Sequence, residues 1–165
     1  MLNFSTHLKK EKGFSLIEIF LVIVLAVILM TVATSMFRSF ATNRNLKEAG
    51  AALMSDMKLA KQKAAAESID YVITIDKENN RYTVKDCCDT ECNSFGCAYN
   101  VTNNLGNYGS NITFTDDVTS YNKITFKSRG TCGAGHVTLQ NLLGSTIKIT
   151  TSMTGRIRSE QNLKN

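Results

Sequence analysis

The chain of 165 residues contains no proline and no tryptophan, and it has two histidines. Without proline, no helix in the chain can be bent by a proline kink. The histidines, His7 and His136, form no Ser-His-carboxylate pattern and no His-Glu-x-x-His zinc motif, and the chain has no glycine-rich phosphate-binding loop. The sequence therefore predicts a protein that is not an enzyme, with no metal site and no cofactor.

Charged residues make up 20% of the chain, and the formal net charge is +5. This composition argues against a wholly disordered chain. The charge is unevenly distributed, because residues 68–121 carry −5 and residues 122–165 carry +6. The globular part is therefore acidic in its first half and basic in its second half.

One long apolar run, Phe14 to Phe37, contains a single charged residue, Glu18. As a helix rising ~1.5 Å per residue, its 24 residues would extend about 36 Å, which is enough to cross the ~30 Å core of a bilayer. Lys9, Lys10 and Lys12 precede the run. We therefore expect the amino end to stay in the cytoplasm and the rest of the chain to face outward.

Three interpretations of this apolar run are open, and they differ in how they account for the charge of Glu18. A cleaved secretory signal is shorter, and an acidic residue inside it would be unusual. A plain membrane anchor would leave the carboxylate unpaired in hydrocarbon, at a cost of about 2.5–3.5 kcal/mol if it were central. In the third interpretation helices pack side by side, and a neighbour supplies the positive partner that makes a buried carboxylate tolerable.

The segment GFSLIE, Gly13 to Glu18, lies between a basic stretch and the apolar run, and it resembles the cleavage motif of type IV prepilins. The resemblance implies that a prepilin peptidase cuts between Gly13 and Phe14 and methylates the new amine of Phe14. It also implies a salt bridge between Glu18 and the terminal amine of a neighbouring subunit. Many major pilins carry a proline in the later half of this helix, and this chain departs from them.

This resemblance implies a leader (residues 1–13), followed by a transmembrane and filament-core helix (14–37). The expected location is the inner membrane, crossed once, with the C-terminal domain in the periplasm, and later a periplasmic or extracellular filament. The expected partners are other pilin or pseudopilin subunits, the prepilin peptidase and the inner-membrane assembly platform.

An apolar stripe continues the helix over residues 38–67. Its members recur at steps of three and four, as on one face of a helix: Leu46, Ala49, Leu53, Met57, Ala60 and Ala64. Lys47, Glu48, Lys58 and Lys61 fall largely off this stripe, which favours a solvated face over a binding role. We therefore predict one helix, from about Phe14 to Glu67, whose amphipathic second half packs on a globular domain.

From residue 68 to residue 165 the pattern changes to alternation, typical of strands. Runs at 71–76 and 81–86 flank a polar turn and predict a hairpin. Further strand candidates lie at 111–115, 123–128, 136–140 and 146–152, with a last short strand finishing at Arg156 and Ile157. Residues 100–110 predict a polar loop. Strands after a single helix predict an α+β fold, in which a long N-terminal helix, membrane-spanning in its first half, packs on an antiparallel β-sheet.

Three later segments resemble the GspH/FimT subgroup of pilin-like proteins. They are MSDMKLAKQKAAAES (54–68), ITFKSRGTCGAG (124–135) and IKITTSMTGRIRS (147–159). Members are minor pseudopilins of type II secretion or minor pilins of type IV pili, and some FimT-like members are implicated in DNA uptake through a C-terminal Gly-Arg-x-Arg motif. Residues Gly155 to Arg158 match that motif. The resemblance therefore implies a pilin-like minor subunit that binds DNA for natural transformation.

The distribution of charge gives an independent reason to expect that the chain binds DNA. Alternation along a strand would place Arg156 and Arg158 on one face, where two guanidiniums suit phosphate oxygens. Lys164, Arg129 and Lys148 lie in the same basic half, so we predict a salt-sensitive contact with double-stranded DNA and little base selectivity. Two alternatives to DNA binding stay open. In one, the arginines protect an exposed strand edge from pairing with other chains. In the other, the chain is a purely structural type II secretion pseudopilin.

The five cysteines all follow the apolar run: Cys87, Cys88, Cys92, Cys97 and Cys132. Export to an oxidising periplasm favours disulfides over a metal cluster in the Cys-rich loop 87–97. Cys132 is the candidate that would tie this loop to the later strands. An odd count leaves one thiol free or intermolecular, and the sequence leaves the pairing open.

Overall fold

The computed structural model describes residues 13–87, 98–109, 111–115 and 122–164, without the side chains of residues 32–36. The predicted leader up to residue 12 and most of the Cys-rich loop lie outside the described residues. The chain divides into two compact units, Met1–Phe37 and Arg38–Asn165.

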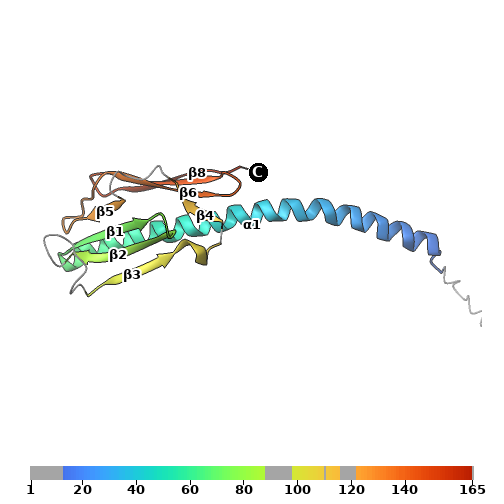
Figure 1. Ribbon diagram of the computed structural model, residues 1–165, viewed down its shortest axis with the longest axis horizontal. Coiled ribbons are helices and arrows are strands. Elements are labelled where there is room, and N and C mark those ends of the chain that lie inside the picture. Colours follow the sequence, from blue (N-terminus) through green and yellow to red (C-terminus); the bar gives the residue numbers. More distant parts are fainter. Residues whose placement is uncertain (1–12, 88–97, 110, 116–121, 165) are drawn as a thin grey trace, which may run out of the picture. The chain divides into compact units, whose positions relative to one another are not determined.

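Helix α1 spans Leu16–Glu67 (Figure 1), which confirms the prediction of one long helix to within two residues at its start. The helix is uninterrupted because it contains no proline and is rich in Ala, Leu, Met and Lys, which are good helix formers. The predicted apolar stripe is also confirmed, since all of its members are buried in the second unit: Leu46, Ala49, Leu53, Met57, Ala60 and Ala64. This stripe is the helix side of the hydrophobic core.

In the first unit, the large apolar side chains that the structure describes are exposed. Between Phe14 and Met30 their exposed fractions run from 42% at Val24 to 85% at Leu16. Among the described residues, no helix is both long enough and apolar enough to cross a membrane. The membrane span expected over residues 14–37 stays a prediction.

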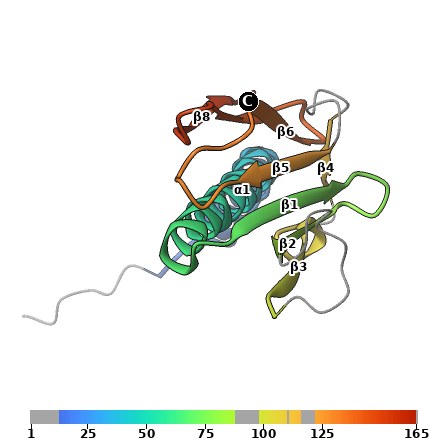
Figure 2. The same ribbon diagram turned by 90° about the vertical axis from the view of Figure 1, so that its left-hand side faces the viewer.

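Two four-stranded antiparallel sheets follow the helix, where the sequence predicts one. Sheet A has the order β3-β2-β1-β5 and consists of β1 (Asp70–Asp76), β2 (Arg81–Cys87), β3 (Asn100–Asn104) and β5 (Lys123–Phe126). Sheet B has the order β4-β6-β7-β8 and consists of β4 (Ile112–Phe114), β6 (Gly135–Asn141), β7 (Thr146–Thr151) and β8 (Ile157–Asn162). Figure 2 shows the two sheets on adjoining sides of the second half of α1. The α+β class is confirmed, but the single sheet was wrong, because alternation within a strand does not say which strand it pairs with.

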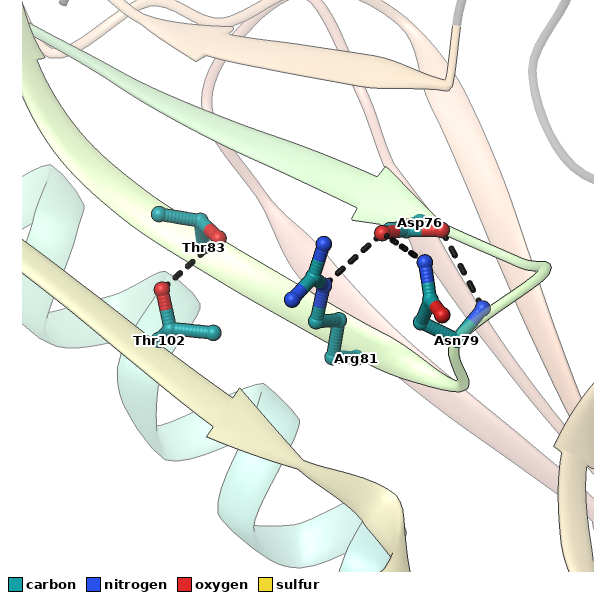
Figure 3. A network of polar contacts seen from close by, with 5 residues as sticks. All are labelled: Asp76, Asn79, Arg81, Thr83 and Thr102. Atoms are coloured by element: carbon teal, nitrogen blue, oxygen red, sulfur yellow. Dashed lines mark hydrogen bonds and ion pairs between the residues drawn. The ribbon is translucent and has the colours of Figure 1, made fainter.

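The predicted hairpin of β1 and β2 is confirmed, and the carboxylate of Asp76 holds its turn (Figure 3). Asp76 accepts hydrogen bonds from the backbone and side-chain nitrogens of Asn79, at 3.2 and 2.9 Å, and from Nε of Arg81 at 2.8 Å. These bonds, those of Asn79 first, hold the pKa of Asp76 below its usual value. On the next strand pair the hydroxyls of Thr83 and Thr102 lie 3.0 Å apart, joining β2 to β3.

Residues 100–110 contain strand β3 and a short 3-10 helix, Leu105–Asn107, and the predicted polar loop was wrong over most of this stretch. Strand β3 lies at the edge of sheet A and exposes nearly all of its side chains. It therefore lacks the apolar alternation by which a strand is recognised. Backbone pairing with β2 and the buried side chain of Leu105 decide its conformation instead.

Sheet A is attached to α1 by tyrosine and amide donors that meet acidic residues of the helix. The hydroxyl of Tyr82 and Nδ2 of Asn103 both donate to Oδ2 of Asp56, at 2.6 and 2.7 Å. The hydroxyl of Tyr71 donates to Oε2 of Glu67 at 2.6 Å. Burial first, and then these carboxylate acceptors, raise the pKa of both tyrosines. These two carboxylates of the helix thus face sheet A.

Candidate functional site

The turn from Ser152 to Arg156 connects β7 to β8 and carries the Gly-Arg-x-Arg motif. Within it, the backbone N–H of Gly155 donates to the carbonyl of Ser152 at 2.8 Å, and the N–H of Ser152 donates to the carbonyl of Arg156 at 3.0 Å. Gly155 has φ of +74°, in the left-handed region that favours glycine. A β-carbon there would overlap the carbonyl oxygen of Gly130. The glycine of the motif is therefore a structural requirement of the turn.

Arg156 and Arg158 lie close to each other on the surface. Both are exposed, and both line one cavity of about 350 Å³ with Thr150, Ser152 and Thr154. Arg158 belongs to β8 and is the register partner of Thr150, whereas Arg156 precedes the strand. The structure thus brings these two sequence-predicted residues together.

The three other predicted DNA contacts are spread over the second unit. Arg129 is exposed in the turn that ends at Gly130, whose carbonyl oxygen abuts Gly155. Lys148 lies in mid-sheet as the register partner of Glu160, so its charge faces an acidic neighbour.

Lys164 follows the far end of β8. Its backbone is fixed there, because its N–H donates to Oγ of Ser145 at 2.9 Å and its carbonyl accepts from Nδ2 of Asn43 at 2.8 Å. Six residues of extended strand separate it from Arg158, which amounts to about 20 Å. Of the five predicted residues, only Arg129, Arg156 and Arg158 lie at one end of sheet B.

Two helix residues join this end of sheet B. Lys58 and Lys61 line a second cavity, of about 420 Å³, together with Gln62, Ala65, Gly155, Arg156 and Ile157. Nζ of Lys61 donates a 2.9 Å hydrogen bond to the carbonyl of Gly155, so the expectation of a merely solvated face was wrong for this residue. The spacing of residues 58, 61, 62 and 65 on one helix face was the signal available in the sequence.

Cys132 is a free, buried thiol, so its predicted disulfide to the 87–97 loop was wrong. It lies at an isolated bridge with Phe126, and its Sγ is 3.0 Å from the carbonyl oxygen of Gly133, to which it donates. Burial raises the pKa of this thiol. Cys88, Cys92 and Cys97 lie outside the described residues. In the part of the chain that the structure describes, no three His, Cys, Asp or Glu residues gather as metal ligands.

The residues expected to direct maturation and assembly belong to the first unit. Gly13 and Phe14 precede the helix, and both are exposed. Glu18 lies in the first turn of α1, where it shares a surface depression of about 300 Å³ with Phe14, Ile19, Val22 and Ile23. Apart from this carboxylate, the depression is lined by apolar side chains.

Solved structures of two kinds share this fold. The minor pseudopilin EpsH of the type 2 secretion system of Vibrio cholerae matches with a TM-score of 0.56 and 12% identity, over 71% of this chain and 97% of EpsH. The type IV minor pilin FimU of Pseudomonas aeruginosa matches with a TM-score of 0.58 and 15% identity, over 73% of this chain and 92% of FimU. No protein-family model and no curated protein matches the chain. The predicted resemblance is thus confirmed at the level of fold, and the chain has the GspH/FimT-like fold of minor pilins and pseudopilins.

Proposed function

We propose that this chain is a minor subunit of a type IV pilus or of a type II secretion pseudopilus. One observation carries the proposal: the apolar side chains between Phe14 and Met30 are exposed over the first half of a long helix. A soluble monomer rarely leaves so large a contiguous apolar surface uncovered. The fold shared with a minor pilin and a minor pseudopilin supports the same helix of neighbouring subunits as the group that covers it.

Maturation precedes assembly in this proposal. The bond between Gly13 and Phe14 lies ahead of the helix and is exposed, so a prepilin peptidase can reach it. Until assembly the chain stays in the inner membrane, with its second unit in the periplasm, beside the assembly platform. Glu18 then pairs with the methylated amine of a neighbouring Phe14, because a carboxylate among apolar side chains is tolerable only when it is paired.

Incorporation into filaments tests this proposal. We expect Glu18→Gln to reach the membrane in normal amounts and to be depleted several-fold from sheared filaments. Glu48→Gln is the matched control, since Glu48 is an exposed carboxylate of the same helix that pairs with Arg44 at 2.9 Å. Equal incorporation of the two variants into filaments would contradict the proposed pairing role of Glu18.

DNA binding is a second candidate function. Arg156 and Arg158 support it because both line one exposed cavity, whose other lining residues, Thr150, Ser152 and Thr154, carry hydroxyl groups. Guanidinium and hydroxyl donors together suit phosphate oxygens and carry no information about base sequence. The role would be uptake of double-stranded DNA for natural transformation. The alternative is a purely structural pseudopilin.

Salt-dependent binding of duplex DNA by the whole chain in detergent micelles tests this second function. Replacing Arg156 and Arg158 by Gln should weaken binding to unrelated sequences alike and flatten the salt slope by about two units. The control, Lys47→Gln with Lys123→Gln, removes the same charge at exposed positions elsewhere. If the unmodified chain binds no DNA at low salt, the structural alternative holds.

A further inference from the structure

In the second half of helix α1, acidic side chains face sheet A and two lysines face the turn of sheet B. Asp56 and Glu67 accept hydrogen bonds from Tyr82 and Tyr71 of sheet A. Lys63 is on the same side, with Nζ 3.7 Å from Oε1 of Glu67. The lysines that remain in this part of the helix, at positions 58 and 61, face the turn before β8. The side of the helix toward sheet B is therefore basic, with no acidic neighbour among the residues that line its cavity.

Lys61 is held in a defined position in this cavity. Its Nζ donates to the carbonyl of Gly155 at 2.9 Å, and the side chain is half-buried. An ammonium group has three N–H donors, so this bond leaves two of them for a ligand. Lys58, one turn earlier, is exposed and adds a second positive charge. A cation that is already positioned loses less conformational entropy when an anion binds.

Arg156 belongs to both cavities of this end of sheet B. It lines the first with Arg158 and the second with Lys58 and Lys61. The two cavities therefore share one lining residue. Four positive charges, from the helix, the turn and β8, form a single strip that a charged backbone could follow.

We propose that the cavity between α1 and the turn, lined by Lys58, Lys61 and Arg156, is a phosphate site that extends the DNA contact of Arg156 and Arg158. This inference rests on the DNA-binding function proposed above. It assigns the helix lysines, which lie outside the Gly-Arg-x-Arg motif, to the same ligand. The side-chain amide of Gln62 gives the cavity a neutral donor beside the cations.

The first test compares two single lysine variants of the whole chain in detergent micelles. Lys58→Gln should weaken duplex DNA binding and lower the salt slope by about one unit, whereas Lys47→Gln, an exposed lysine of the same helix, should change it little. Lys58→Arg keeps the charge and should bind as the unmodified chain does. Lys58 is exposed, so none of these changes should disturb folding.

The second test places a carboxylate in the cavity. Ala65→Glu adds a negative charge at a lining position, and Ala66→Glu adds the same charge at the adjacent exposed residue, which does not line the cavity. Both variants change the net charge equally, so their difference isolates the local site. We expect Ala65→Glu to weaken binding to duplex DNA several-fold more than Ala66→Glu does.

The outcomes separate this inference from the function on which it rests. If the unmodified chain binds DNA and only the arginine variant is impaired, the phosphate site is overturned and the DNA function stands. If the unmodified chain binds no DNA at low salt, both are overturned. Matching losses in Lys58→Gln and Ala65→Glu, with normal binding in Lys47→Gln and Ala66→Glu, support the site.

Discussion

Gly155 packs against the carbonyl oxygen of Gly130 so closely that a β-carbon at position 155 would overlap it. This contact joins the turn after β5 to the turn before β8. The φ of +74° at Gly155 adds a second reason for glycine at this position. The turn that carries Arg156 therefore depends on the absence of a side chain at its first motif residue.

Gly155→Ala should lower the free energy of unfolding by more than about 2 kcal/mol, because a left-handed conformation and a steric overlap are both unfavourable for alanine. Urea denaturation followed by circular dichroism measures the change. Gly133→Ala is the control, since no atom lies within 4 Å of a β-carbon there, and it should change stability by about 0.5 kcal/mol or less. Similar losses in both variants would contradict the packing argument.

Alkaline pH should destabilise the fold through Tyr82. Burial first, and then its bond to Asp56, raise the pKa of Tyr82 above the usual value of 10.0. Below pH 10.0 both states keep the proton and the full contribution to stability is present. Above that pH the unfolded chain loses the proton while the folded chain retains it, so stability falls as the pH rises.

Tyr82→Phe should remove part of this alkaline dependence. We expect a loss of about 1 kcal/mol at neutral pH, from the missing hydrogen bond to Asp56, and a shallower decline at alkaline pH. Midpoints of urea denaturation, measured for both proteins below and above pH 10.0, would show this difference. If the decline is as steep in the variant as in the unmodified chain, Tyr82 is not the group responsible.

We expect one of the five cysteines to be a free thiol and the other four to be in disulfides. Cys132 is free and buried, and Cys87 is disulfide-bonded. We expect the exported chain, denatured without reductant, to take one alkyl group, at Cys132, and five after reduction. In the folded chain this alkylation should be slow, because burial raises the pKa of the Cys132 thiol and lowers its thiolate fraction. A label on any cysteine of the 87–97 loop before reduction would contradict this assignment.

Maturation should yield a chain that begins at a methylated Phe14. Mass spectrometry of the protein from cells with prepilin peptidase measures the terminus directly. Gly13→Ala should slow or block the cut, because the resemblance to prepilins implies glycine itself at this position. An intact leader on the unmodified protein would refute the assignment of Gly13 and Phe14.

Much of the fold follows from local periodicity. A helix buries one face every three or four residues, so the stripe from Leu46 to Ala64 was predictable without any knowledge of its partner. Alternation likewise gave the hairpin of β1 and β2. Edge strand β3 escaped prediction because exposed side chains leave no such pattern, and its conformation comes from pairing with β2.

The sequence by itself determined the long helix and most of the strands, but the predicted last strand was wrong, since β8 begins at Ile157 and Arg156 lies in the turn before it. Only the tertiary structure decided that Lys61 meets Gly155, 94 positions along the chain, and that Cys132 is buried as a free thiol. The physical reason is the distance along the sequence between the residues that interact. Periodicity is a property of neighbouring residues, whereas a hydrogen bond between distant residues exists only once the helix and both sheets have packed together.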